Sequence, residues 1–327
     1  MKRRSLVIAL ASAAALFATW TPAAADYPER PITMIVPFAA GGPTDIVARI
    51  AGEYMAKSLG QAVVVENVAG AGGTTGITRA SQAKPDGYVI MMGHMGTHGA
   101  APALYPALKY DPTKDFAPIG LVAGTPILIV TRKDFPAQNL KDFVDYVKAN
   151  QNKVNEAHAG VGSVSFTTCT LLQSQMGTKT ARVAYRGTGP VLNDLVAGQV
   201  DFACDQIVNL VSQIQAGSIK ALAIATATRS DVLKDVPTTK EAGLPEFQVS
   251  AWNAIFAPKG TPAAVVAKLN AALVAALDDE NTRRRLLELG SVIPDKAGRT
   301  PEALQALVES EVARWTPVLK AAGAVAN

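Results

Sequence analysis

The sequence has 327 residues, of which 49% are hydrophobic and 18% charged, and its formal net charge is +4. This composition is typical of a globular protein and excludes a disordered or fibrous chain. Three of the positive charges lie at Lys2, Arg3 and Arg4, so the rest of the chain is too close to neutral for a nucleic-acid-binding protein. The small numbers of His and Cys argue against a zinc or iron–sulfur site, and we expect no metal.

The N-terminus has the three parts of a secretory signal peptide. The basic residues 2–4 are followed by an apolar run at 6–17 and by small residues at 23–25. The apolar run is shorter than the roughly 20 residues of a membrane-spanning helix, and Pro22 follows it. We therefore expect cleavage after Ala25 and an exported mature chain with no direct membrane insertion.

From residue 32 onward, apolar β-rich runs alternate with helical patterns. The expected strands cover 32–38, 62–68, 88–93, 119–131, 154–159, 181–185, 200–204 and 219–226. The main helices expected between them cover 45–59, 140–149, 165–176, 190–197 and 209–216. After an extended segment at 248–258, the chain is mostly helical. Continuous apolar strands separated by helices predict an α/β fold with mainly parallel sheets covered on both faces.

The loop at 37–45 joins the first strand to a helix and contains Gly41-Gly42. Glycine lets the main chain approach a ligand, and the first N–H groups of a helix are unpaired donors at its positive end. The loop therefore predicts a carboxylate or phosphate site, although a simple capped turn would have the same sequence. Asp45 is unsuited to contact an anion and is expected to cap or orient the loop.

The glycine-rich turn at 70–76 does not match a dinucleotide-binding site. The third glycine of the G-x-G-x-x-G pattern is replaced by Thr75, and no acidic residue ends the strand at 88–93. Export also removes the chain from cytoplasmic nucleotides. We expect no cofactor.

Three further turns, at 93–98, 160–165 and 185–190, follow strands and precede helices. In a parallel sheet these turns share one edge, where ligands bind. Thr97, Ser163 and Ser165 would add hydroxyl donors there. His98 would donate to a carboxylate or fill the core as a structural residue.

Two charged residues belong to the same edge. Arg186 either pairs with an anion or is solvated, and Asp205, after the strand at 200–204, either lies at the binding edge or caps a helix. No G-x-S-x-G, S-x-x-K, H-E-x-x-H or P-loop motif occurs, so a hydrolase is the weaker hypothesis and no catalytic residue is predicted.

The motifs resemble those of the Bug family, the periplasmic solute-binding proteins of tripartite tricarboxylate transporters. The resemblance rests on Pro37-Phe38-x-x-Gly41-Gly42-x-x-Asp45, the turn at 70–76, Gly162-Ser163, Tyr185-x-Gly187-Thr188-Gly189-Pro190 and Gly198-Gln199-Val200-Asp201. Arg229-Ser230, Asp235-Val236-Pro237-Thr238 and Ala257-Pro258-x-Gly260-Thr261-Pro262 extend it along the mature chain.

The resemblance implies a two-lobed periplasmic binding fold of type II, a Venus flytrap with its ligand between the lobes. It assigns residues 26–124 and 249–327 to lobe 1 and residues 125–248 to lobe 2. It implies a non-catalytic, monomeric receptor that delivers a small carboxylate, with a dicarboxylate favoured, to a membrane permease. Tricarboxylates, acidic amino acids and aromatic acids stay open as ligands, and a sensor partner stays open in place of the permease.

The family holds its carboxylate mainly with loop N–H groups, small hydroxyls and water. Carried over by motif, the ligand-binding residues are Phe38, Ala40, Gly42, Thr44, Gly162, Ser163, Ser165 and Asp205, with Thr97 and His98 as looser matches. A secreted hydrolase of carboxylate esters is the alternative from another class.

Cys169 and Cys204 are predicted to form a disulfide. Export places them in an oxidising compartment. Cys169 lies in the first turns of the helix at 165–176, and Cys204 ends a strand, so both belong to the same edge of a parallel layer. Two buried free thiols are the alternative.

Overall fold

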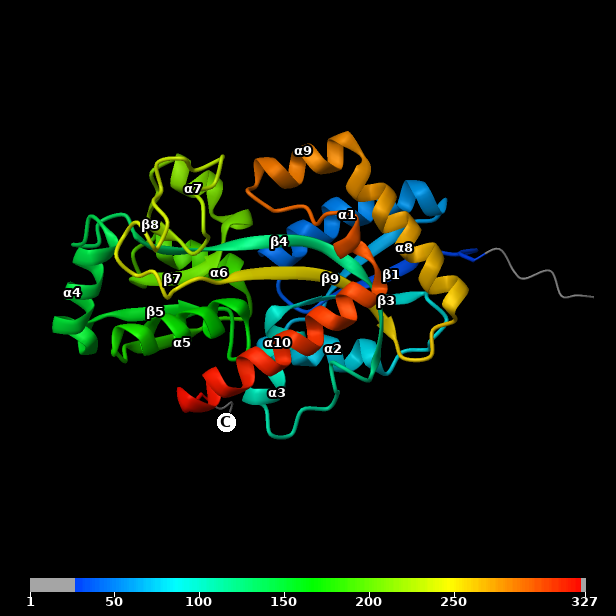
Figure 1. Ribbon diagram of the computed structural model, residues 1–327, viewed down its shortest axis with the longest axis horizontal. Coiled ribbons are helices and arrows are strands. Elements are labelled where there is room, and N and C mark those ends of the chain that lie inside the picture. Colours follow the sequence, from blue (N-terminus) through cyan, green and yellow to red (C-terminus); the bar gives the residue numbers. More distant parts are fainter. Residues whose placement is uncertain (1–26, 325–327) are drawn as a thin grey trace, which may run out of the picture.

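The computed structural model describes residues 27–324 (Figure 1). The predicted signal peptide, residues 1–25, lies outside the described residues, so its cleavage stays a prediction. Among the described helices, none is long and apolar enough to cross a membrane.

The first half of the molecule is built on three parallel strands. These are β1 (Ile32–Val36), β2 (Val63–Asn67) and β3 (Val89–His94), with β1 in the middle. Successive side chains of a strand point to opposite faces, and accordingly Met34 and Ile35 belong to two different buried apolar clusters. Both faces of this part of the sheet are therefore covered.

The helices of the first half come from both ends of the chain. They are α1 (Pro43–Leu59), α2 (Thr74–Ser81), α3 (Ala101–Leu104), α8 (Ala263–Asp278), α9 (Glu280–Glu288) and α10 (Pro301–Ala321). α1 packs on α8, and α10 packs along β4 and α3 and reaches α5 of the second half (Figure 1).

The second half contains the middle of the chain. Its strands are β5 (Asn155–His158), β6 (Ala181–Ala184), β7 (Phe202–Gln206) and β8 (Ile219–Ile224). Its helices are α4 (Leu140–Asn150), α5 (Val164–Met176), α6 (Thr188–Val196) and α7 (Val211–Gln215). β5 runs parallel to both β6 and β7, as expected for strands joined through helices.

Two long strands join the halves. β4 (Phe116–Arg132) and β9 (Ser250–Pro258) pair antiparallel and run side by side through the middle of the molecule (Figure 1). The strand order is β2-β1-β3-β9-β4-β7-β5-β6, and β8 also pairs with β4.

The expectation of mainly parallel sheets is therefore correct for β1–β3 and β5–β7, and the pairs made by β4 and β9 depart from it. β9 pairs antiparallel with β3, and β4 pairs antiparallel with β7 and β8. The chain enters the second half along β4 and returns along β9, so the two directions are opposite. A continuous apolar run shows that a strand is buried but does not give its direction. The residue ranges assigned to the two lobes stay a prediction.

Candidate ligand site

A narrow cavity of about 10 Å³ lies where loops of the two halves meet. Its wall in the first half is formed by Phe38, Pro43, Thr44 and His94. Its wall in the second half is formed by Ala159, Ser163, Val164, Ser165, Thr188, Asp205 and Gln206. No Lys or Arg is among these described wall residues.

Three helices begin at this cavity. α1 starts after Gly42, α5 after Ser163 and α6 after Gly187, and residues of each first turn line the wall. The first N–H groups of a helix have no partner in their own helix, and the helix dipole places its positive end there. The three helix N-termini therefore place positive partial charge at the cavity wall without a cationic side chain, which suits an anionic group.

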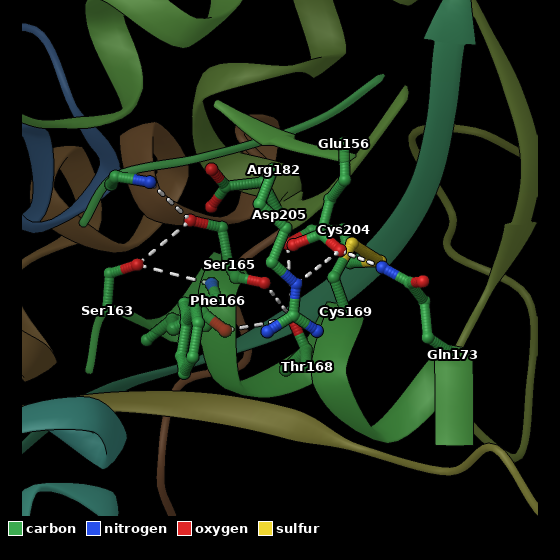
Figure 2. The surroundings of a disulfide bond; sticks show 12 residues. Glu156, Ser163, Ser165, Phe166, Thr168, Cys169, Gln173, Arg182, Cys204 and Asp205 are labelled. Atoms are coloured by element: carbon green, nitrogen blue, oxygen red, sulfur yellow. Dashed lines mark hydrogen bonds and ion pairs between the residues drawn. A yellow bond between two sulfur atoms is a disulfide. The ribbon is translucent and has the colours of Figure 1, made fainter. Parts of the chain in front are cut away.

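The serine loop before α5 is fixed by its own hydrogen bonds (Figure 2). Ser163 Oγ accepts from the Phe166 N–H at 3.2 Å and caps the helix. Ser165 Oγ accepts from the Ala159 N–H at 3.0 Å, and the two serine oxygens are 3.2 Å apart. Both side chains are buried, so the hydroxyls are held in place before a ligand arrives.

Asp205 lies inside strand β7, and neither of its oxygens caps a helix. Oδ2 accepts from the Thr188 hydroxyl at 2.8 Å, and Oδ1 accepts from the Gln206 N–H at 2.7 Å. Burial raises the pKa of Asp205 to about 6, because it penalises the charged form more than these two donors stabilise it. The expected strand ended one residue before Asp205, whereas the observed strand continues to Gln206 and places the carboxylate on the cavity wall.

His94 is a cavity residue that the sequence reasoning did not single out. Its Nδ1 accepts from the N–H groups of Gly96 at 2.8 Å and Thr97 at 3.2 Å, so the ring hydrogen is on Nε2. The ring stacks on Phe38 with centroids 4.9 Å apart. Burial lowers the pKa of His94 to about 4, which keeps the ring neutral near pH 7. The signal was its place at the end of β3, one residue beyond the expected strand.

Thr97 and His98 lie behind this wall. Thr97 Oγ1 is 2.9 Å from His98 Nδ1, and both residues are fully buried. The His98 ring stacks on Phe256 with centroids 4.1 Å apart, and burial lowers its pKa to about 3. Neither residue lines the cavity, so a ligand contact from Thr97 or His98 stays a prediction, and the packing of His98 on Phe256 agrees with its alternative structural role.

Asp45 orients the first loop, and that prediction is confirmed. Its carboxylate accepts from the Gly41 N–H at 3.0 Å, from Arg49 and from Asn67 Nδ2 at 2.9 Å. The Asn67 amide also donates to the Phe38 carbonyl at 2.9 Å. Among the predicted ligand residues of this loop, Phe38 and Thr44 line the cavity, whereas Ala40 and Gly42 shape the loop beside it.

The two halves also touch each other beside this cavity. The Tyr105 hydroxyl donates to the Val161 carbonyl oxygen. A Cβ atom on Gly72 would lie 1.7 Å from that same oxygen, and one on Gly162 would lie 2.8 Å from the Tyr105 ring. The structure is therefore in a closed arrangement in which small residues let the main chains of the two halves meet.

A second, larger cavity of about 510 Å³ adjoins the first and shares Phe38 and Ala159 with it. It is lined by the glycine-rich turn at 70–73, by Tyr105 and Tyr185, and by Arg186. Arg186 therefore lies outside the smaller cavity.

The predicted disulfide is confirmed. Cys169 of α5 and Cys204 of β7 are bonded, with their Cα atoms 5.3 Å apart and both side chains fully buried (Figure 2). The Thr168 hydroxyl donates to the Cys204 carbonyl at 3.1 Å. These two links fasten the helix that carries Ser163 and Ser165 to the strand that carries Asp205. Within residues 27–324, no group of three or more His, Cys, Asp or Glu side chains forms a candidate metal site.

Comparison with known proteins identifies relatives over most of the chain. Residues 47–324 match the model of the tripartite tricarboxylate transporter family receptor. MatC from Rhodopseudomonas palustris, solved with bound malate, is 50% identical, with a TM-score of 0.88 over 90% of this chain and 100% of that one.

Two further structures support the match. The periplasmic binding protein BugD is 45% identical, with a TM-score of 0.88 over 91% of this chain and 99% of its own. A Rhodopseudomonas palustris protein solved with adipate is 32% identical, with a TM-score of 0.86 over 91% and 98% of the two chains. The predicted fold class, a two-lobed periplasmic binding protein, is confirmed.

Proposed function

The chain belongs to the tripartite tricarboxylate transporter receptor family, with Bug proteins among its relatives, and we propose that it captures a small dicarboxylate between its two halves. Its family consists of periplasmic solute-binding proteins. The observation that carries the proposal is the meeting of three helix N-termini at one cavity whose wall has no Lys or Arg among the described residues.

The ligands of related proteins indicate a short dicarboxylate. The small cavity of about 10 Å³ has room for about one water molecule, so the two halves must move apart to admit a ligand. The related proteins solved with malate and with adipate hold dicarboxylates of four and six carbons. A dicarboxylate of this length supplies the anionic group that the helix N-termini favour.

We assign the ligand contacts to the cavity wall. Phe38 and Thr44 act from the first half, and Ser163, Ser165 and Asp205 from the second. Ala40, Gly42 and Gly162 keep the loops close enough for their N–H groups to reach the ligand. Thr97 and His98 act indirectly, by supporting the wall from behind.

The remaining parts of the proposal concern the protein's role in the cell. The signal peptide is removed after Ala25, residues 26–124 and 249–327 form one lobe, and residues 125–248 form the other. The mature chain is a monomer without catalytic activity, and it delivers its ligand to the membrane permease of the transporter.

The test is calorimetry on protein exported with its own signal peptide and purified from the periplasm. Succinate, malate, adipate, citrate, aspartate and benzoate form the panel. We expect one molecule of a dicarboxylate to bind per chain, to raise the melting temperature and to remain unchanged. X-ray scattering is expected to show a smaller radius of gyration in the complex.

Two results would contradict the proposal. One is that no carboxylate of the panel binds the folded protein. The other is turnover of carboxylate esters, which would favour the secreted hydrolase.

A further inference from the structure

The wall of the small cavity carries one hydrogen-bond donor whose direction and protonation are fixed in advance. His94 Nδ1 is occupied by the N–H groups of Gly96 and Thr97, at 2.8 and 3.2 Å. Nε2, with its hydrogen, is therefore the polar ring atom available to a ligand. Stacking on Phe38 holds the plane of the ring. The ring is neutral, so it offers a directional N–H rather than a positive charge.

The same wall carries an acceptor. Asp205 is 1% exposed, and each of its oxygens already accepts one hydrogen bond, from Thr188 and from the Gln206 N–H. A carboxylate oxygen has two lone pairs, so each can accept a second donor. When ionised, the side chain can only accept. An unsubstituted carboxylate ligand has no hydrogen to give it, and the negative charge of Asp205 disfavours a second anionic group beside it.

From these two groups we propose that His94 and Asp205 together recognise a hydroxyl group on the bound dicarboxylate by hydrogen bonds. The ligands are then hydroxy-dicarboxylates. The inference rests on the proposed function and adds to it a specificity-determining residue, His94. A hydroxyl both accepts and donates, so it satisfies His94 Nε2–H and the Asp205 carboxylate at once.

Other groups in place of the ligand hydroxyl cannot hydrogen-bond to both His94 and Asp205. A methylene group hydrogen-bonds to neither side chain, so it leaves the His94 Nε2–H without a partner and adds no second donor to Asp205. An ammonium group donates to Asp205 and cannot accept from His94. Leaving buried polar groups unpaired is costly, and sites built to bind a substrate hydroxyl reject the analogue that lacks it.

The first experiment measures the affinities of the wild-type protein at pH 8 for succinate, both enantiomers of malate, and aspartate. At this pH Asp205 is ionised. We expect one enantiomer of malate to bind at least about tenfold more tightly than succinate and more tightly than aspartate.

The second experiment compares two matched variants. Asparagine is a good N-cap residue, so His94→Asn keeps an acceptor for Gly96 and Thr97 but removes the ring donor. His158→Asn makes the same change at another buried histidine, whose Nδ1 accepts from the Gly160 N–H at 3.1 Å and which does not line the cavity. We expect His94→Asn to reduce the malate-to-succinate affinity ratio severalfold, and His158→Asn to lower the melting temperature while leaving the ratio unchanged. A merely structural role of His94 would weaken both ligands equally.

The outcomes separate the two proposals. The recognition of a hydroxyl is wrong if the protein binds dicarboxylates without preferring malate to succinate. It is also wrong if the affinity ratio is unchanged in folded His94→Asn. In both cases the proposed receptor function is unaffected. Absence of binding by every dicarboxylate overturns the proposed function itself. Should His94→Asn fail to fold, the preference of the wild-type protein among the ligands decides the question.

Discussion

Replacing both Cys169 and Cys204 with alanine removes the link between α5 and β7. The two residues are 35 positions apart, and closing a loop of that length stabilises a folded chain by about 4 kcal/mol at 25 °C in the chain-entropy model. At roughly 2 °C per kcal/mol for a chain of this size, the melting temperature is expected to fall by about 8 °C. Both side chains are fully buried, so the small voids left by the sulfur atoms add to the loss.

The assay is equilibrium unfolding in urea, followed by tryptophan fluorescence with and without a thiol reductant. The alanine variant is its own control, because reductant cannot change it. We expect the wild-type protein to unfold at a higher urea concentration than the variant under oxidising conditions. Wild-type protein that is reduced while unfolded should unfold at nearly the same concentration as the variant. A difference below about 1 kcal/mol, with the wild-type disulfide verified by intact mass, would refute this reasoning.

Two further predictions concern closure and pH. Gly72→Ala places a Cβ atom 1.7 Å from the Val161 carbonyl oxygen, so malate should bind at least about tenfold more weakly and no longer reduce the radius of gyration; unchanged affinity would contradict the role of this contact. Burial raises the pKa of Glu156 from 4.5 to about 7 despite the nearby Arg182, so the stability contributed by the protonated carboxyl is present at low pH and lost as pH rises through 7. The side chain introduced by Glu156→Gln cannot ionise. The free energy of unfolding of this variant, minus that of the wild type, should therefore increase by up to about 3 kcal/mol between pH 5 and pH 8. Parallel curves of unfolding free energy against pH for the two proteins would contradict this prediction.

The sequence was most informative where local rules decide the structure. Apolar runs located the strands. The expected helix starts, after a cap at Thr44 or Asp45 and at Ser165, lie within two residues of the observed N-caps Gly42 and Ser163. The edge rule of parallel layers was sufficient to pair Cys169 with Cys204, because a helix and a strand of one layer share an edge. The loops that carry Phe38 and Ser163 belong to different halves, and the resemblance to a two-lobed receptor was the ground for expecting them at one cavity.

The sequence was least informative where a shift of one residue changes the direction of a side chain. The expected strand 88–93 ended one residue before His94, so His94 was assigned to the turn and His98 was chosen as the candidate. His98 packs on Phe256 in the core. The expected strand 200–204 likewise ended one residue before Asp205, which was assigned to a loop. Since side chains alternate along a strand, such errors exchange a cavity residue for a buried one. Thr188 and Gln206 belong to the wall only because tertiary packing brings α6 and β7 to it.

The position of β9 between β3 and β4 affects the order in which the chain can fold. β3 ends at His94, and its partner β9 begins only at Ser250, so this sheet requires residues far apart in the sequence. Loop-closure entropy must be overcome before such a pairing contributes stability, and non-local pairings make folding slow. The N-terminal part of the chain therefore cannot complete its sheet until synthesis has passed Pro258. A nascent chain therefore keeps the edges of β3 and β4 that face β9 unpaired until Pro258 has been synthesised.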